Sequence, residues 1–117
     1  MEQSKSIKQH KLICKYVACS QHPNQEVSFN YLNRPYPSLH IHDYWEILLV
    51  VDSSLTHIVN DKTYTMKSGD VCLLRPYDIH CFTFEKENKT KTLTFLIKTE
   101  YMQKILSVYS NDLYARL

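Results

Sequence analysis

Three side chains able to act as metal ligands or hydrogen-bonding groups lie close together near the middle of the chain. The position numbers of His40, His42 and Glu46 differ by two and four. Because successive side chains of a β-strand point to opposite faces, a regular strand would place all three on one face. Two imidazoles and a carboxylate that converge in this way form a site suited to a small ligand or a metal ion.

Two interpretations of this group differ in whether a metal ion is bound. Imidazole nitrogens and a carboxylate oxygen suit iron, manganese, nickel or zinc, with open positions left for substrate. His80, on a later strand, could add a nitrogen to His40, His42 and Glu46. Alternatively, these side chains hydrogen-bond to one another or to an organic ligand, which satisfies them without a metal. We expect no cofactor and keep a divalent transition metal as the alternative.

The same alternation predicts which aromatic residues share the face of this group, because residues of equal parity, an even number of positions apart, point to the same side of a strand. Tyr44 has the parity of His40 and His42, and Phe82 has that of His80, so both are expected to line the ligand site. Trp45 has the opposite parity, which predicts a residue packed in the core. The remaining histidines have no partner at a useful spacing, and we expect ordinary exposed or turn residues at His10, His22 and His57.

Composition excludes several classes of protein. The 117 residues suit one domain, and the formal net charge of +2 is too small for a surface that holds nucleic acid by its phosphates. A single glycine excludes phosphate-binding loops, and no run approaches the ~20 apolar residues of a membrane span. The four cysteines form no Cys-x-x-Cys pair and the first residues form no signal peptide. We therefore expect a reduced, cytoplasmic protein without membrane or direct nucleic-acid contacts.

Short segments of β-like composition dominate the chain. Turn residues, including Asn60-Asp61-Lys62 within a β-hairpin, separate them. The expected strands cover residues 11–18, 27–32, 40–51, 55–59, 63–66, 71–74, 79–85 and 92–98. This pattern predicts an all-β protein with an antiparallel barrel, closed or sandwiched.

The end of the chain has a helical pattern instead. Apolar residues recur at spacings of three and four, which predicts one amphipathic helix over residues 99–117. The apolar stripe either caps the barrel or contacts a second subunit. In the second case the dimer contacts are Met102, Leu106, Tyr109 and Leu113. The whole chain, 1–117, is thus interpreted as one domain, with a barrel over about residues 11–98 and this helix.

The polar motif resembles a known family. His40-x-His42-x-x-x-Glu46, followed by Gly69-Asp70, Pro76 and His80, resembles the two motifs of the cupins. The resemblance covers residues 38–98. The segments His-Ile-His-Asp-Tyr-Trp-Glu-Ile-Leu and Gly-Asp-Val-Cys-Leu-Leu-Arg-Pro-Tyr-Asp-Ile-His are similar to the N-terminal sensing domain of AraC-type transcriptional regulators. The implied fold is an antiparallel double-stranded β-helix, the cupin or jelly-roll barrel, with one C-terminal α-helix.

The resemblance also implies a function. Such domains bind a small-molecule effector, often a sugar or related metabolite, and pair as homodimers through their helices. They precede a helix-turn-helix portion that we expect to be absent here, since only 19 residues follow Lys98. The implied ligand-binding residues are His40, His42, Tyr44, Glu46, His80 and Phe82. We expect no enzyme activity.

The alternative from a different class is a stand-alone metal-dependent cupin enzyme, a dioxygenase or isomerase. Its metal ligands would be His40, His42, Glu46 and His80. Ser53 and Tyr77 stand where the cupin motifs usually have glycine. We therefore expect altered turns at these two positions, which weakens the enzyme interpretation more than the fold.

Overall fold

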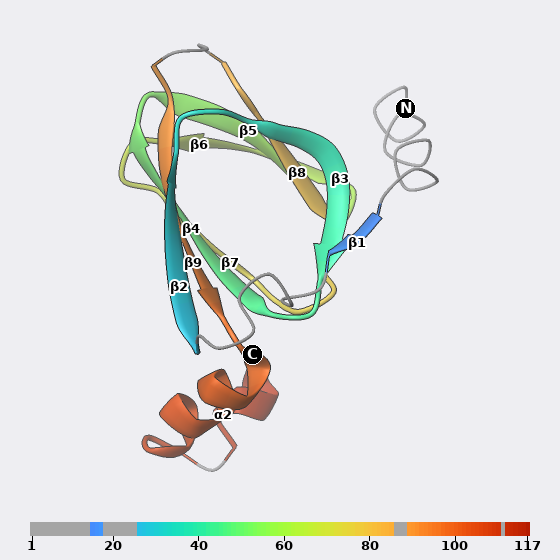
Figure 1. The fold of residues 1–117 in the computed structure, drawn as a ribbon, viewed down its shortest axis with the longest axis vertical. Coiled ribbons are helices and arrows are strands. Elements are labelled where there is room, and N and C mark those ends of the chain that lie inside the picture. Colours follow the sequence, from blue (N-terminus) through green and yellow to red (C-terminus); the bar gives the residue numbers. More distant parts are fainter. Residues whose placement is uncertain (1–14, 18–25, 86–88, 111) are drawn as a thin grey trace.

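Two facing β-sheets form a barrel, and a helix follows at one end (Figure 1). The structure is a computed structural model that describes residues 15–17, 26–85, 89–110 and 112–117. Its strands are β1 (Lys15–Val17), β2 (Val27–Leu32), β3 (Tyr36–His42), β4 (Trp45–Asp52), β5 (Ser54–Val59), β6 (Lys62–Lys67), β7 (Val71–Leu74), β8 (His80–Phe84) and β9 (Lys91–Ile97). The predicted strand over residues 11–18 lies partly outside the described residues.

The strand order confirms the double-stranded β-helix. One sheet has the order β1-β3-β8-β5-β6 and the other β2-β9-β4-β7. All neighbours pair antiparallel except β1 and β3. Consecutive strands therefore alternate between the sheets, except where the hairpin joins β5 to β6. The two sheets enclose one interior, into which every second side chain points.

The interior is polar in one half and apolar in the other. The inward residues of β8 change from His80 to Phe82 and Phe84, and those of β4 change from Glu46 to the aliphatic residues that follow. The apolar half is a cluster of Leu48, Val50, Leu55, Met66, Phe82 and Phe84. This cluster supplies the hydrophobic core, so the polar side chains of the other half can form a site.

The predicted single strand over residues 40–51 is wrong, because the chain turns at Asp43 and Tyr44. β3 belongs to the five-stranded sheet and β4 to the four-stranded sheet, so the chain changes sheets here. At this corner the His42 carbonyl accepts a hydrogen bond from the Tyr77 N–H at 2.7 Å. The Thr99 hydroxyl donates to the Asp43 carbonyl at 3.0 Å. Partners outside the strand ladder thus stabilise the corner.

Two turns keep a glycine-like backbone without glycine. Ser53 has φ 64° and Tyr77 has φ 69°, so the expectation of altered turns at these positions is wrong. The hairpin prediction is confirmed, because Asn60 and Asp61, with φ 48° and 71°, form its two-residue turn. Left-handed backbone costs a non-glycine residue about 1–2 kcal/mol.

Replacement of Ser53 by glycine is expected to raise the free energy of unfolding by about 0.5–1 kcal/mol. The strain relieved exceeds the conformational entropy that glycine adds to the unfolded chain. Urea denaturation of both proteins measures the change. Asp52→Gly is the control, because it adds the same entropy at a strand residue outside the left-handed region. Equal destabilisation by both changes would contradict the prediction.

The predicted helix over residues 99–117 is also wrong in its extent. Helix α2 covers Thr99–Ser107 and a short 3-10 helix, η2, covers Tyr114–Arg116. Serine, β-branched and aromatic residues favour helices weakly, and the chain after Lys104 is rich in them. The Ser107 hydroxyl bonds to the Lys104 carbonyl, and the Ser110 hydroxyl to Asp112. These local bonds compete with continuation of the helix.

The apolar stripe of α2 caps the barrel. Met102 is buried against Trp45 and Ile97, with Leu106 and Tyr114 at the edge of this cluster. The Trp45 indole N–H donates to the Tyr114 hydroxyl at 3.3 Å. Trp45 is therefore a core residue, as predicted. Because Met102 is buried in this cluster, it cannot also be a large dimer contact.

No helix among the described residues is long and apolar enough to span a membrane.

Candidate functional site

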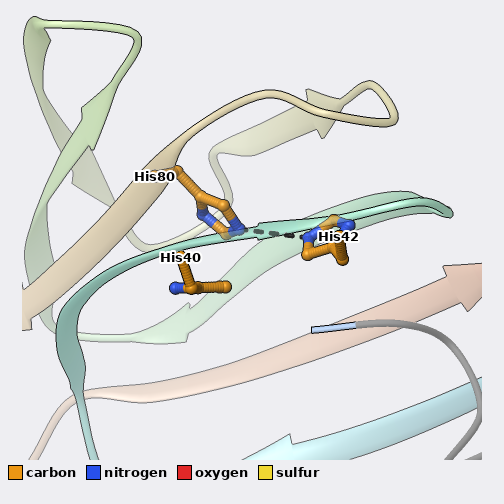
Figure 2. Close-up of side chains that lie close together, drawn as sticks. All are labelled: His40, His42 and His80. Atoms are coloured by element: carbon orange, nitrogen blue, oxygen red, sulfur yellow. Dashed lines mark hydrogen bonds between the residues drawn. The ribbon is translucent and has the colours of Figure 1, made fainter. Parts of the chain in front are cut away.

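The predicted polar group does come together, although from three strands. His40 and His42 lie on β3, and His40 is directly opposite His80 in the pairing of β3 with β8. Figure 2 shows these three imidazoles beside one another inside the barrel. Glu46 reaches the group from β4 in the facing sheet, and its Oε1 lies 3.4 Å from His42 Nε2. The side chains converge because all of them face the interior.

The three imidazoles form a compact set of donor atoms. One nitrogen from each of His40, His42 and His80 lies within 4.8 Å of the other two. His42 Nε2 and His80 Nε2 are 3.2 Å apart, and the ring centroids of His40 and His80 are 4.1 Å apart. The Glu46 carboxylate stands outside this set of three. All four side chains are buried.

A fourth buried histidine belongs to the same network, and the expectation that His57 is an exposed or turn residue is wrong. Its side chain is fully buried, and His57 Nε2 lies 3.0 Å from His80 Nδ1. On β5 it shares the parity of Leu55, which is also fully buried. That shared parity was the sequence signal for its position. The predictions for His10 and His22 concern residues outside the described part of the chain.

If every ring of the network is neutral, the hydrogen bonds allow one proton arrangement. His42 Nδ1 donates to the Tyr44 carbonyl at 2.9 Å, so its Nε2 is an acceptor. His80 Nε2 then donates to His42, and His80 Nδ1 accepts from His57 Nε2. It follows that His57 Nδ1 carries a lone pair. Among the described residues it has no hydrogen-bond partner.

Burial favours the neutral form of three imidazoles, those of His40, His57 and His80. It lowers the pKa of His57 to about 4, against a weaker opposing effect of Glu46. Burial also lowers the pKa of His80 well below its ordinary value, and nearby histidines add to this effect. The pKa of His40 is lowered by the same cause, although its hydrogen bond to the Ser38 carbonyl opposes it. Neutral histidines can serve as metal ligands and as hydrogen-bonding groups.

A cavity of about 250 Å³ opens beside this network. Four of the six residues predicted to bind ligand line it, namely His40, Tyr44, Glu46 and Phe82. His42 and His80 lie behind its wall: His42 stacks on Tyr44 and His80 contacts His40. The other lining residues are Asn30, Leu32, Arg34, Pro35, Tyr36, Thr94 and Leu96.

Sequence reasoning missed the polar contribution of β2 and β9. Asn30 and Thr94 are paired neighbours that face the cavity. Phe29 and Phe95, which alternate with them, lie on the outer face. Alternation alone would place the aromatic residues inside, so it points the wrong way here. At this point of β2 and β9, polar side chains therefore face the cavity while aromatic side chains face outward.

Comparison with known proteins identifies similar sequences. A family model described as the AraC-like ligand binding domain matches residues 22–116. The HTH-type transcriptional activator RhaS of Pectobacterium carotovorum is 44% identical over 43 residues, which are 37% of this chain and 15% of that protein. RhaS of Yersinia pestis is 40% identical over 43 residues, 37% of this chain and 16% of that protein. The match spans only about a sixth of the length of these relatives.

Solved structures share the fold. An RmlC-like cupin from Shewanella frigidimarina has a TM-score of 0.57 at 14% identity, covering 65% of this chain and 69% of that chain. An RmlC-like cupin with a double-stranded β-helix from Methanocaldococcus jannaschii has a TM-score of 0.56 at 16% identity, covering 70% and 78%. At these identities the likeness concerns the fold alone.

Proposed function

Because this chain belongs to the family of AraC-like ligand-binding domains, we propose that its barrel binds a small polar effector beside His40 and Glu46. In this proposal it is the sensing part of a transcriptional regulator and catalyses no reaction. The observation that carries the proposal is the cavity itself, in which hydrogen-bonding side chains and apolar side chains from both sheets face one another.

The walls of the cavity suit a hydroxyl-rich molecule. Asn30, Thr94 and Glu46 offer hydrogen-bonding groups from the four-stranded sheet, while His40 and Phe82 face them from the other. A volume of about 250 Å³ equals that of roughly eight water molecules, at about 30 Å³ each. A ligand of roughly eight to twelve non-hydrogen atoms would therefore fill it. Monosaccharides combine this size with many hydroxyl groups, and we propose a sugar or related metabolite.

The wider role follows from the same proposal. The effector would alter contacts of this domain with a second copy or with a DNA-binding portion in the cytoplasm, while the domain itself touches no nucleic acid. For a homodimer, Tyr109 is the best placed of the predicted contacts, since 77% of its surface is exposed. Leu113 is half-buried, and Leu106 is partly buried against the cluster of Trp45, Ile97 and Met102.

Binding should depend on the polar wall of the cavity. We expect Asn30→Ala to weaken sugar binding about tenfold, because a ligand hydroxyl loses one buried partner. A panel of pentoses, hexoses, deoxyhexoses and sugar acids, tested by thermal shift and then calorimetry, identifies the ligand. Asn33→Ala, at an exposed residue outside the cavity, is the matched control. A ligand that binds both variants and the parent protein equally would contradict this location.

The three-histidine group favours a second candidate, a metal-dependent cupin enzyme. His40 Nδ1 and His42 Nδ1 donate to backbone carbonyls, which leaves the Nε2 lone pair of each for a metal. With His80 in its other tautomer, His80 Nδ1 would donate to His57 and its Nε2 would be free. Metal–nitrogen bonds of about 2.0–2.1 Å place ligand nitrogens about 3 Å apart, close to the 3.2 Å between His42 and His80. The residues therefore fit a divalent transition metal, which would supply Lewis-acid or redox chemistry.

Metal analysis separates the two candidates. For an effector-binding barrel we expect far less than one transition metal per chain in protein purified without a metal-affinity tag. About one metal per chain, absent from a His40→Ala, His42→Ala double variant, would instead support the enzyme. Elemental analysis by mass spectrometry gives the stoichiometry. The control is Asn33→Ala, which leaves all four polar side chains in place.

A further inference from the structure

A second cavity lies on another side of the barrel, between the edges of the two sheets. β6 ends the five-stranded sheet and β7 ends the four-stranded sheet. The cavity between them has a volume of about 440 Å³, and a neighbouring one of about 310 Å³ shares Tyr64, Cys72 and Leu73 with it. Together they form a groove, which we call the edge groove. None of its lining residues belongs to the cavity beside Glu46.

The edge groove has a buried acceptor in its wall. His57 lines the larger cavity, and its side chain is fully buried. Its Nε2 bonds to His80, so the nitrogen without a partner among the described residues is Nδ1. A buried polar atom that lacks a partner costs about 1–3 kcal/mol, and native proteins keep few of them. A ligand with a donor group would remove this cost once a neighbouring side chain moves aside, because Nδ1 itself has almost no accessible surface.

The surroundings of His57 restrict the chemistry of that ligand. Met66, Val71 and Leu73 make the walls largely apolar, and the Tyr64 ring lies directly opposite His57 in the pairing of β5 with β6. In the arrangement in which all the rings are neutral, His57 Nε2 donates to His80 and His57 Nδ1 carries a lone pair, so a ligand bound there would be the donor. In the larger cavity, beside His57, Asp70 disfavours an anion, whereas the other charged side chains of the groove, Lys62, Arg75 and Asp78, line the smaller cavity.

We propose that the edge groove is a second small-molecule site. It binds a neutral, mainly apolar molecule whose single hydroxyl or N–H group donates to His57 Nδ1. Phenols have this chemistry, because they combine an apolar ring with one strong donor. Its lining residues are separate from those of the cavity beside Glu46, and the proposal requires the His80 tautomer that accepts a hydrogen bond from His57.

The test compares phenol with toluene, which has the same ring and no donor. Binding is followed by NMR on protein with ¹⁵N-labelled histidine. We expect phenol to shift the Nδ1 signal of His57 and to bind about tenfold more tightly than toluene. The Asn30→Ala variant, which is altered in the cavity beside Glu46 (the effector cavity), should bind phenol like the parent protein.

Two variants test the location. Cys72→Phe fills the edge groove from β7 without removing a member of the histidine network, and it should abolish phenol binding. Thr56→Phe is its control, because Thr56 lies on β5 outside the groove and should leave binding unchanged. His57→Phe should remove the preference for phenol over toluene.

The proposal would be overturned by equal affinity for phenol and toluene, by phenol binding that survives Cys72→Phe, or by a His57 Nδ1 signal that does not move at saturating phenol. Loss of phenol binding in Asn30→Ala would place the molecule in the effector cavity and would overturn it as well.

Discussion

Replacement of His80 by alanine is expected to lower the free energy of unfolding by about 3–5 kcal/mol. His80 is fully buried and lies between two hydrogen-bond partners, His42 Nε2 at 3.2 Å and His57 Nε2 at 3.0 Å. The change leaves both partners unsatisfied at about 1–3 kcal/mol each and adds a cavity where the ring was. Urea denaturation at neutral pH measures the loss.

Two further variants separate the causes of this loss. His80→Leu restores most of the volume but neither hydrogen bond, so it isolates the polar contribution. Thr83→Ala changes an exposed residue of the same strand and should cost about 0.5 kcal/mol or less. If His80→Ala cost no more than Thr83→Ala, the histidine network would not stabilise the barrel.

Stability should fall as the pH is lowered from about 6.5 towards 4. The folded state holds the pKa of His57 at about 4, below its ordinary value of 6.5, mainly through burial. The unfolded chain therefore binds the proton first, so the contribution of His57 is present above pH 6.5 and is lost as the pH falls. One group contributes at most about 1.4 kcal/mol per pH unit, and about 1.6 kcal/mol between pH 6.5 and 5, because the unfolded histidine is only half protonated at pH 6.5. His80 and His40, whose pKa values are also lowered, add to the loss.

Urea denaturation of chelator-treated protein at several pH values between 6.5 and 5 tests this expectation. His57→Phe should reduce the slope of stability against pH by up to about one proton, which identifies the share of His57. The carboxyl of Asp78 should not interfere. Although burial alone would raise its pKa, hydrogen bonds from Arg75 and Asn60 hold the pKa below its usual value, so it titrates under this range. Stability that is constant between pH 6.5 and 5 would contradict the prediction.

The sequence predicted which residues of the site come together better than it predicted the strands that carry them. His40, His42 and Glu46 were grouped on the assumption of one continuous strand, whereas β3 and β4 belong to different sheets. The grouping survives because the chain keeps the same residues facing inward as it turns the corner. His57 was not grouped with them, since its partner His80 lies 23 residues away and meets it only through the pairing of β5 with β8.

By itself the sequence determined the all-β class, most strand positions, the hairpin turn and the family resemblance. These features depend on local alternation, turn residues and a short motif, which are properties of neighbouring residues. Only the tertiary structure decided that Asn30 and Thr94 face inward while Phe29 faces out, that α2 ends at Ser107, and that His57 completes the network. The reason is that a closed barrel assigns each face by pairing between strands far apart in the chain. Alternation within one strand tells which residues share a face, but not which face is enclosed.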